Sequence, residues 1–173
     1  FAEFLAFRGL KVETRLQALS DKTRIKHLLR EYLAFGGLPL AVLSQQKQEI
    51  LGAYFEDILL RDIAARHGIR KVGKLRSLAQ FLLTNIASQA SLRKTSKLFQ
   101  LSMDTAQRFA QYMDDAYLLR FASKFSYSLK QQEANPKKPY AVDLGLRNVL
   151  GFTFSEDLGK LYENAVFNTL HMQ

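Results

Sequence analysis

Apolar side chains recur at helical spacing through the first half of the chain. Between Lys47 and His67 they follow one another every three or four residues and define a single broad stripe: Ile50, Leu51, Tyr54, Phe55, Ile58, Leu59 and Ile63. A shorter stripe lies before it (Leu28, Leu29, Tyr32, Leu33), and a similar one follows it (Leu75, Leu78, Phe81, Leu82, Ile86). Gly36-Gly37 with Pro39 end the first of these helices, and Gly68 ends the second. The pattern predicts a bundle of amphipathic helices over residues 1–84.

The pattern changes after residue 90. Ser91 is placed to cap a short helix over residues 92–99, and Ser102 to cap a second helix that runs to about Ala116. The apolar face of this second helix consists of Ala106, Phe109, Ala110, Met113 and Tyr117. Residues 117–125 and 139–143 are then predicted to be strands, separated by a polar loop. Helix, turn, helix, strand, loop and strand is the order of a winged helix, which we predict over residues 85–143.

The last part of the chain returns to helical periodicity. Residues 144–150 predict one or two helical turns that end at Gly151. Ser155 is expected to cap a final helix, with Glu156 and Asp157 in its first turn. Its apolar face would contain Leu158, Leu161, Tyr162, Ala165, Val166 and Leu170. The expected fold class is therefore mainly α, a helical bundle followed by a winged helix with a small β-ribbon.

Composition narrows the classes of function. The 173 residues include no cysteine, which excludes disulfides, thiolate metal sites and a cysteine nucleophile. No apolar run approaches the roughly 18 residues of a membrane span, so we expect a cytoplasmic chain without membrane contact. The formal charge is +9, and residues 81–140 contain nine basic and four acidic side chains. This balance favours an anionic partner for the middle of the chain.

No sequence motif for catalysis is complete in this chain. Gly68-Ile-Arg-Lys-Val-Gly73-Lys74 fits the phosphate-binding loop pattern, but Leu75 stands where a Ser or Thr must ligate magnesium, and an amphipathic helix precedes it. Two glycines at helix ends explain it. The histidines are far apart (His27, His67, His171), and no acidic residue is followed two positions later by lysine, the pair that metal-dependent nucleases use. We predict no catalytic residue, no metal and no bound cofactor in this chain, and hence no enzyme activity of its own.

Binding is the better-supported hypothesis. The outer side of the helix after Ser102 would present Thr105, Gln107, Arg108 and Gln111, and Gln and Arg form bidentate hydrogen bonds with adenine and guanine edges. Further cations would reach phosphates from the preceding helix (Arg93, Lys94, Lys97) and from the wing (Lys130, Lys137, Lys138). We therefore expect double-stranded DNA as the partner. The alternative is a protein-interaction or homo-oligomerisation module, favoured by the acidic Asp114 and Asp115 and by the broad stripe of residues 47–67.

Several blocks of the sequence resemble the C-terminal region of prokaryotic AAA-superfamily ATP-binding proteins. The blocks that carry the resemblance are Tyr32-Leu-Ala-Phe-Gly-Gly-Leu-Pro39, Tyr54-Phe-Glu-Asp-Ile-Leu-Leu-Arg-Asp-Ile63, Asn85-Ile-Ala-Ser88, Phe125-Ser-Tyr-Ser-Leu-Lys130, Asn135-Pro-Lys-Lys-Pro-Tyr-Ala-Val-Asp-Leu-Gly145 and Ser155-Glu-Asp-Leu-Gly-Lys-Leu-Tyr-Glu-Asn-Ala-Val-Phe167. They occur in the family's order and cover most of the chain.

The resemblance implies a domain plan and a wider function. It implies that residues 1–84 are a helical lid or linker after an absent ATPase core, and that residues 85–143 are the winged helix. Residues 144–173 would begin a truncated nuclease-like domain, in which Glu163 matches the family's first acidic position. ATP and Mg²⁺ would bind the missing core of the parent protein, which would lie in cis and act as the ATPase.

Overall fold

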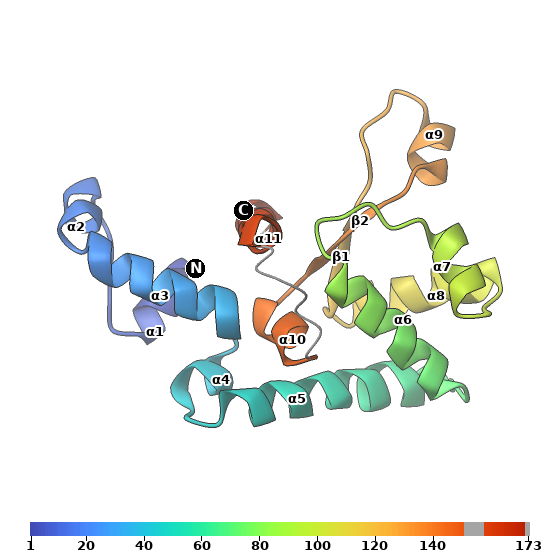
Figure 1. Ribbon diagram of the computed structural model, residues 1–173, viewed down its shortest axis with the longest axis horizontal. Helices are drawn as coiled ribbons and strands as arrows, with labels where there is room; N and C mark the ends of the chain where they lie inside the picture. Colours follow the sequence, from blue (N-terminus) through green and yellow to red (C-terminus); the bar gives the residue numbers. More distant parts are fainter. Residues whose placement is uncertain (151–157, 172–173) are drawn as a thin grey trace.

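The computed structural model describes residues 1–150 and 158–171, which form a mainly helical protein with one two-stranded antiparallel sheet. This confirms the expected mainly α fold class with a small β-ribbon. The predicted Ser155 cap, with Glu156 and Asp157, lies outside the described residues. A long helical rod connects one group of short helices to a second group around the β-ribbon, as Figure 1 shows.

The first group contains α1 (Ala2–Phe7), α2 (Arg15–Ser20), α3 (Lys22–Phe35) and α4 (Pro39–Leu43). α3 ends where predicted, because Gly36 adopts a positive φ of 74° that breaks the helix. α1, α3 and α4 meet over a small core of Phe4, Leu5, Leu10, Leu28 and Val42. Tyr32 on α3 packs against both this core and the larger one of the protein.

The rod is α5 (Lys47–Asp57), which continues without a break into the π-helix η1 (Ile58–Ala65). The sequence pattern predicted a regular α-helix throughout, and for the second half this was wrong. The deeply buried residues Leu51, Phe55, Leu59 and Ile63 repeat every four positions. Leu51 and Phe55 lie in α5 and Leu59 and Ile63 in η1, so one buried face continues from the α-helix into the π-helix.

The second group begins with α6 (Val72–Thr84), α7 (Leu92–Leu98) and α8 (Met103–Asp115). Both predicted serine caps are present, because the Ser91 side chain accepts from Lys94 N and that of Ser102 accepts from Thr105 N at 3.1 Å. Tyr117 departs from the prediction. It follows the end of α8 with a φ of 55°, is 65% exposed, and lies under the guanidinium group of Arg120.

The sheet pairs β1 (Leu119–Ala122) with β2 (Lys138–Ala141), so that Leu119 faces Ala141 and Ala122 faces Lys138. Both strands are shorter than predicted. The segment between them contains a short helix, α9 (Leu129–Ala134), where the sequence predicted only a loop. An isolated β-bridge joins Ala90 to Lys137 and adds the segment before α7 to the edge of the ribbon.

The chain continues with α10 (Leu144–Val149) and α11 (Leu158–His171). α10 packs between α3 and α5, and α11 packs against β2 (Figure 1). The main hydrophobic core extends from Leu33 through the rod, α6 and α8 to Leu146. This core thus contains residues from each of the three segments that the family resemblance implies, which are 1–84, 85–143 and 144–173.

Asp143 ties these segments together. Its buried carboxylate accepts hydrogen bonds from Gly37 N at 2.7 Å and from Gly145 N at 2.8 Å. Burial raises the pKa of Asp143, and the backbone N–H donors of Gly37 and Gly145 act in the opposite direction. Both ends of this joint need glycine, because a Cβ on Gly36 would collide with the Asp143 carboxylate and one on Gly145 with the Phe35 carbonyl.

Candidate nucleic-acid interface

The surface of α8 is divided between a buried face and a polar ridge. Ala106, Phe109, Ala110 and Met113 are buried, as their spacing predicts. On the opposite side Gln107, Arg108 and Gln111 are exposed, so the structure presents together the side chains proposed to read bases. The ridge is the part of this helix that a groove of DNA would meet first.

Two of these side chains have partners on α8 itself. Arg108 Nη2 lies 2.8 Å from Asp104 Oδ2, one helical turn away, and Gln111 Nε2 donates to Asp115 Oδ1 at 2.9 Å. The Arg108 and Asp104 side chains are 59% and 74% exposed. Exposed pairs of this kind contribute only about 0.3–0.5 kcal/mol. The Arg108–Asp104 pair is neutral, while Asp115 keeps its negative charge because Gln111 is uncharged. Little free energy is needed to exchange either contact for another partner.

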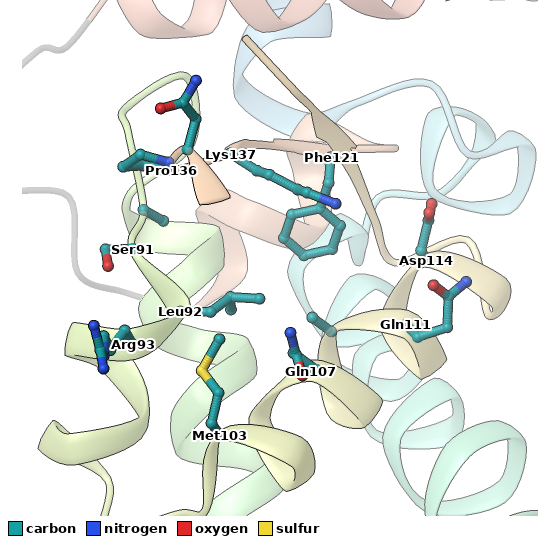
Figure 2. A pocket seen from close by; sticks show the side chains of 13 residues that line it. Ser91, Leu92, Arg93, Met103, Gln107, Gln111, Asp114, Phe121, Pro136 and Lys137 are labelled. Atoms are coloured by element: carbon teal, nitrogen blue, oxygen red, sulfur yellow. The ribbon is translucent and has the colours of Figure 1, made fainter. Parts of the chain in front are cut away.

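A groove of about 350 Å³ separates α8 from the β-ribbon. Figure 2 shows that Gln107, Gln111 and Asp114 approach it from α8, while Phe121 and Lys137 approach from the ribbon. Arg93 reaches it from the start of α7. Four of the predicted DNA-binding residues thus line one groove: Arg93, Gln107, Gln111 and Lys137. Asp114 is the groove's acidic member, and its carboxylate pairs with Arg120 at 2.5 Å.

The remaining predicted residues lie around this groove rather than in it. Lys94 and Lys97 are exposed on α7, and Lys130 is exposed on α9. Thr105 is half-buried, and its hydroxyl lies 2.8 Å from the Ser102 hydroxyl at the start of α8. It therefore completes the helix cap as well as bordering the surface.

Lys138 and Glu163 contact each other. Lys138 Nζ donates to Glu163 Oε1 at 2.8 Å, and Tyr140 Oη donates to the same oxygen at 2.7 Å. These bonds hold the pKa of Glu163 below its usual value, whereas partial burial, with the bond to Glu163, raises the pKa of Tyr140 to about 12. Since alternate side chains of a strand point to opposite faces, Lys138 faces α11 while Lys137 faces the groove. In the described structure Glu163 links α11 to the ribbon.

Sequence reasoning missed the residues that fix α11 to β2. Asn164 is fully buried; its Oδ1 accepts from Ala141 N and its Nδ2 donates to Ala141 O, both at 2.8 Å. Asn168 Nδ2 adds bonds to Ala141 O and Val142 O at 3.0 and 2.9 Å. The Asn164 amide thus pairs with the outer edge of β2 as a neighbouring strand would. An Asn four residues before another was the available signal, but no pattern identified its partner.

Residues 68–74 form the end of one helix and the start of the next. Gly68 has a positive φ of 60° three residues after the end of η1, and α6 begins at Val72. The segment does not connect a strand to a helix, as a phosphate-binding loop does. Within residues 1–150 and 158–171, no group of three or more His, Asp and Glu side chains is placed to hold a metal ion. In the same ranges, no helix combines the length and the apolar character needed to cross a bilayer.

Fold and site together define a mainly helical protein with an exposed polar helix beside a small β-ribbon. A family described as a domain of unknown function, DUF8612, matches residues 26–157. The chain belongs to this family, and the match includes the α3 glycine turn, the rod, α8 and Asp143.

Two curated relatives match nearly the whole chain. An uncharacterized protein of Methanocaldococcus jannaschii is 31% identical over 175 residues, which is 96% of this chain and 38% of the relative. An uncharacterized protein of Haemophilus influenzae is 29% identical over 96% of this chain and 42% of its own length. The chain thus spans about two fifths of the length of these relatives. No solved structure matches it.

Proposed function

We propose that this chain is the DNA-binding, non-catalytic part of a larger ATP-dependent protein. The observation that carries the proposal is the polar ridge of α8, which presents Gln107, Arg108 and Gln111 beside a groove bordered by Arg93 and Lys137. Gln and Arg have the donor and acceptor geometry to read base edges, and the flanking cations suit phosphates.

The order of elements supports a winged-helix interpretation. α6 precedes the bridging residue Ala90, and then α7, α8, β1 and β2 follow. Ala90 bonds to Lys137 as a one-residue third strand at the edge of the ribbon. α6 lies before the predicted bounds of 85–143 but packs against α8 and β2, so the proposed module is extended to include it as the first helix. In this arrangement α8 is the recognition helix, and the segment from Ser123 to Lys137 is the wing.

The distribution of charge also supports the proposal. On α7, Arg93, Lys94 and Lys97 are exposed and form no ion pair with the described residues. The same is true of Lys130 on α9. Cations without carboxylate partners attract the phosphate backbone and release its counterions on binding.

The link to ATP hydrolysis is the second half of the proposal. It is supported by the resemblance to AAA-superfamily proteins and by the greater length of the relatives. The helices of residues 1–84 share one core with α8 and α10. A movement of an attached ATPase core would therefore reach the DNA-binding face through packed helices rather than through a flexible linker.

We expect the Arg108→Ala variant to bind its preferred duplex about 1–3 kcal/mol more weakly than the unchanged chain, because it loses a base contact. Duplexes are first selected from a randomised pool with the unchanged chain. Fluorescence anisotropy then gives affinities for a selected and a scrambled 24-base-pair duplex at several salt concentrations.

Arg30→Ala is the matched control, because Arg30 is exposed on α3 at the other end of the molecule. It should change neither affinity nor preference. The assignment of α8 as the recognition helix fails if Arg108→Ala leaves the affinity unchanged. The whole proposal fails if the unchanged chain does not bind at low salt, or binds without salt dependence.

One observation favours protein interaction as a second function. α11 exposes Leu158, Tyr162, Val166 and Leu170 at a spacing of four, each at least 45% exposed, although the sequence predicted this face to be buried. The stripe of the rod, by contrast, is covered by the main core. Light scattering distinguishes the functions, because an oligomer that is indifferent to DNA would support protein interaction.

A further inference from the structure

The loop between η1 and α6 lies directly beside α8. A shallow hollow of about 250 Å³ separates them, lined by residues 67–71 of the loop and by Thr105, Arg108, Phe109 and Tyr112 of α8. The lining includes Gly68 to Lys71, which belong to the segment that fits the sequence pattern of a phosphate-binding loop but lacks the structure of one. The DNA-binding residues predicted from the sequence do not include Arg70 or Lys71.

The loop is held against α8 by specific contacts. The His67 ring stacks on the Tyr112 ring, with centroids 3.6 Å apart and planes 8° apart. Lys74 Nζ donates to Gln100 O at 2.7 Å, which ties the first turn of α6 to the connection between α7 and α8. Ile69 N donates to Ala64 O at 2.9 Å and closes the loop onto the end of the rod. The position of the loop relative to α8 is therefore fixed by the fold.

The hollow is positively charged. Arg70 and Lys71 are exposed, and among the described residues neither contacts a carboxylate. Arg108 also lines the hollow, but it is paired with Asp104 at 2.8 Å, so Arg70 and Lys71 supply the unpaired positive charge of the lining. Lys71 also occupies the N-cap position of α6 without a side-chain capping bond, at a helix end where the dipole disfavours positive charge. A positive charge at a helix N-terminus is locally unfavourable, and an unfavourable feature without a compensating contact is typical of a site that binds a ligand.

The hollow and the groove lie on opposite flanks of the α8 ridge. Successive helical residues are 100° apart, so Thr105, Arg108 and Tyr112 form one flank, while Met103, Gln107 and Asp114 form the other. A helix in the major groove, which is about 12 Å wide, has a phosphate backbone on each side. With α8 in such a groove, α7 and the wing would face one of these backbones, and the loop would face the other.

We propose that Arg70 and Lys71 contact the DNA phosphate backbone on the flank of α8 opposite to α7 and the wing. This inference rests on the proposed DNA binding. It makes the loop a second, sequence-independent anchor, so that α8 is held in the groove from both sides.

The test compares two double variants of equal charge. Arg70→Ala/Lys71→Ala removes the proposed anchor, and Lys22→Ala/Lys26→Ala removes two exposed lysines from α3, at the other end of the molecule. Anisotropy with a 24-base-pair duplex gives the slope of log affinity against log salt for each chain. The anchor variant should reduce the magnitude of this slope by about 2, with discrimination between duplexes unchanged. The control should keep the slope.

The outcomes separate this inference from the proposed function. If the unchanged chain does not bind DNA at low salt, the proposed function fails and the anchor with it. If the unchanged chain binds and both double variants keep its slope, only the anchor is wrong. Equal losses in both double variants would also contradict the anchor, because they would reflect net charge rather than position. Circular dichroism melting confirms that both variants remain folded.

Discussion

The Gly36→Ala variant is expected to lose about 3–5 kcal/mol of unfolding free energy. Gly36 has φ 74° and ψ −161°, a region that only glycine occupies readily, which accounts for about 1–3 kcal/mol. The added Cβ would also displace the buried Asp143 carboxylate, whose hydrogen bonds to Gly37 N and Gly145 N each contribute about 1.5–3 kcal/mol as bonds to a charged group. Urea unfolding followed by circular dichroism measures the loss.

Gly9→Ala is the matched control for this experiment. Gly9 has a similar φ of 71°, but a Cβ there meets no heavy atom within 4 Å. It should cost about 1–2 kcal/mol, the effect of the backbone conformation alone. Equal losses of unfolding free energy in the two variants would show that the hydrogen bonds of Asp143 do not contribute to stability.

Asn164→Ala should destabilise the protein by about 2–4 kcal/mol. The variant leaves Ala141 N without its partner and removes one of two donors to Ala141 O, while opening a cavity at a fully buried position. Each unsatisfied buried backbone group costs about 1–3 kcal/mol. Urea unfolding measures the total, and amide hydrogen exchange at Ala141 reports the local effect.

Asn168→Ala separates this role from a general effect of shortening a side chain on α11. It removes the second donor to Ala141 O and the bond to Val142 O, but Ala141 N keeps its bond to Asn164. We expect a loss of about 1 kcal/mol and an unchanged exchange rate at Ala141. An Asn164→Ala variant as stable as the unchanged chain would contradict the proposed docking of α11.

Local features of the fold could be predicted from the sequence because their causes are local. The serine caps of α7 and α8 lie within three residues of the N–H groups that they accept from. The buried face of α8 follows from helical spacing alone. The polar ridge of the candidate site is the complement of that face, and it was predicted for the same reason.

Features that join distant segments could not be predicted. Asp143 and Gly37 are 106 positions apart, and no periodicity brings a carboxylate to that glycine. The position of Arg70 and Lys71 beside α8 depends on the direction of the rod and on the His67–Tyr112 stack. The sequence shows that these two residues are basic, but only the packed structure shows that they lie beside α8.

α11 shows how an amphipathic pattern can mislead. Its periodic apolar residues predicted a buried face, yet Val166 and Leu170 are 57% and 66% exposed. The side that docks onto β2 contains Glu163, Asn164 and Asn168, because the free edge of a strand offers hydrogen-bonding groups rather than an apolar surface. Periodicity identified the helix correctly and part of its packed side, since Leu161 and Ala165 of the predicted face do pack against the main core.

Hydrogen–deuterium exchange of the chain with and without a saturating duplex tests most directly that α8 and its two flanks form the DNA-binding face. The account predicts slower exchange upon DNA binding in peptides from residues 66–74 and 91–111, and no change in α3. Protection confined to α11 or to the helices of residues 1–43, at a DNA concentration that saturates binding, would contradict it.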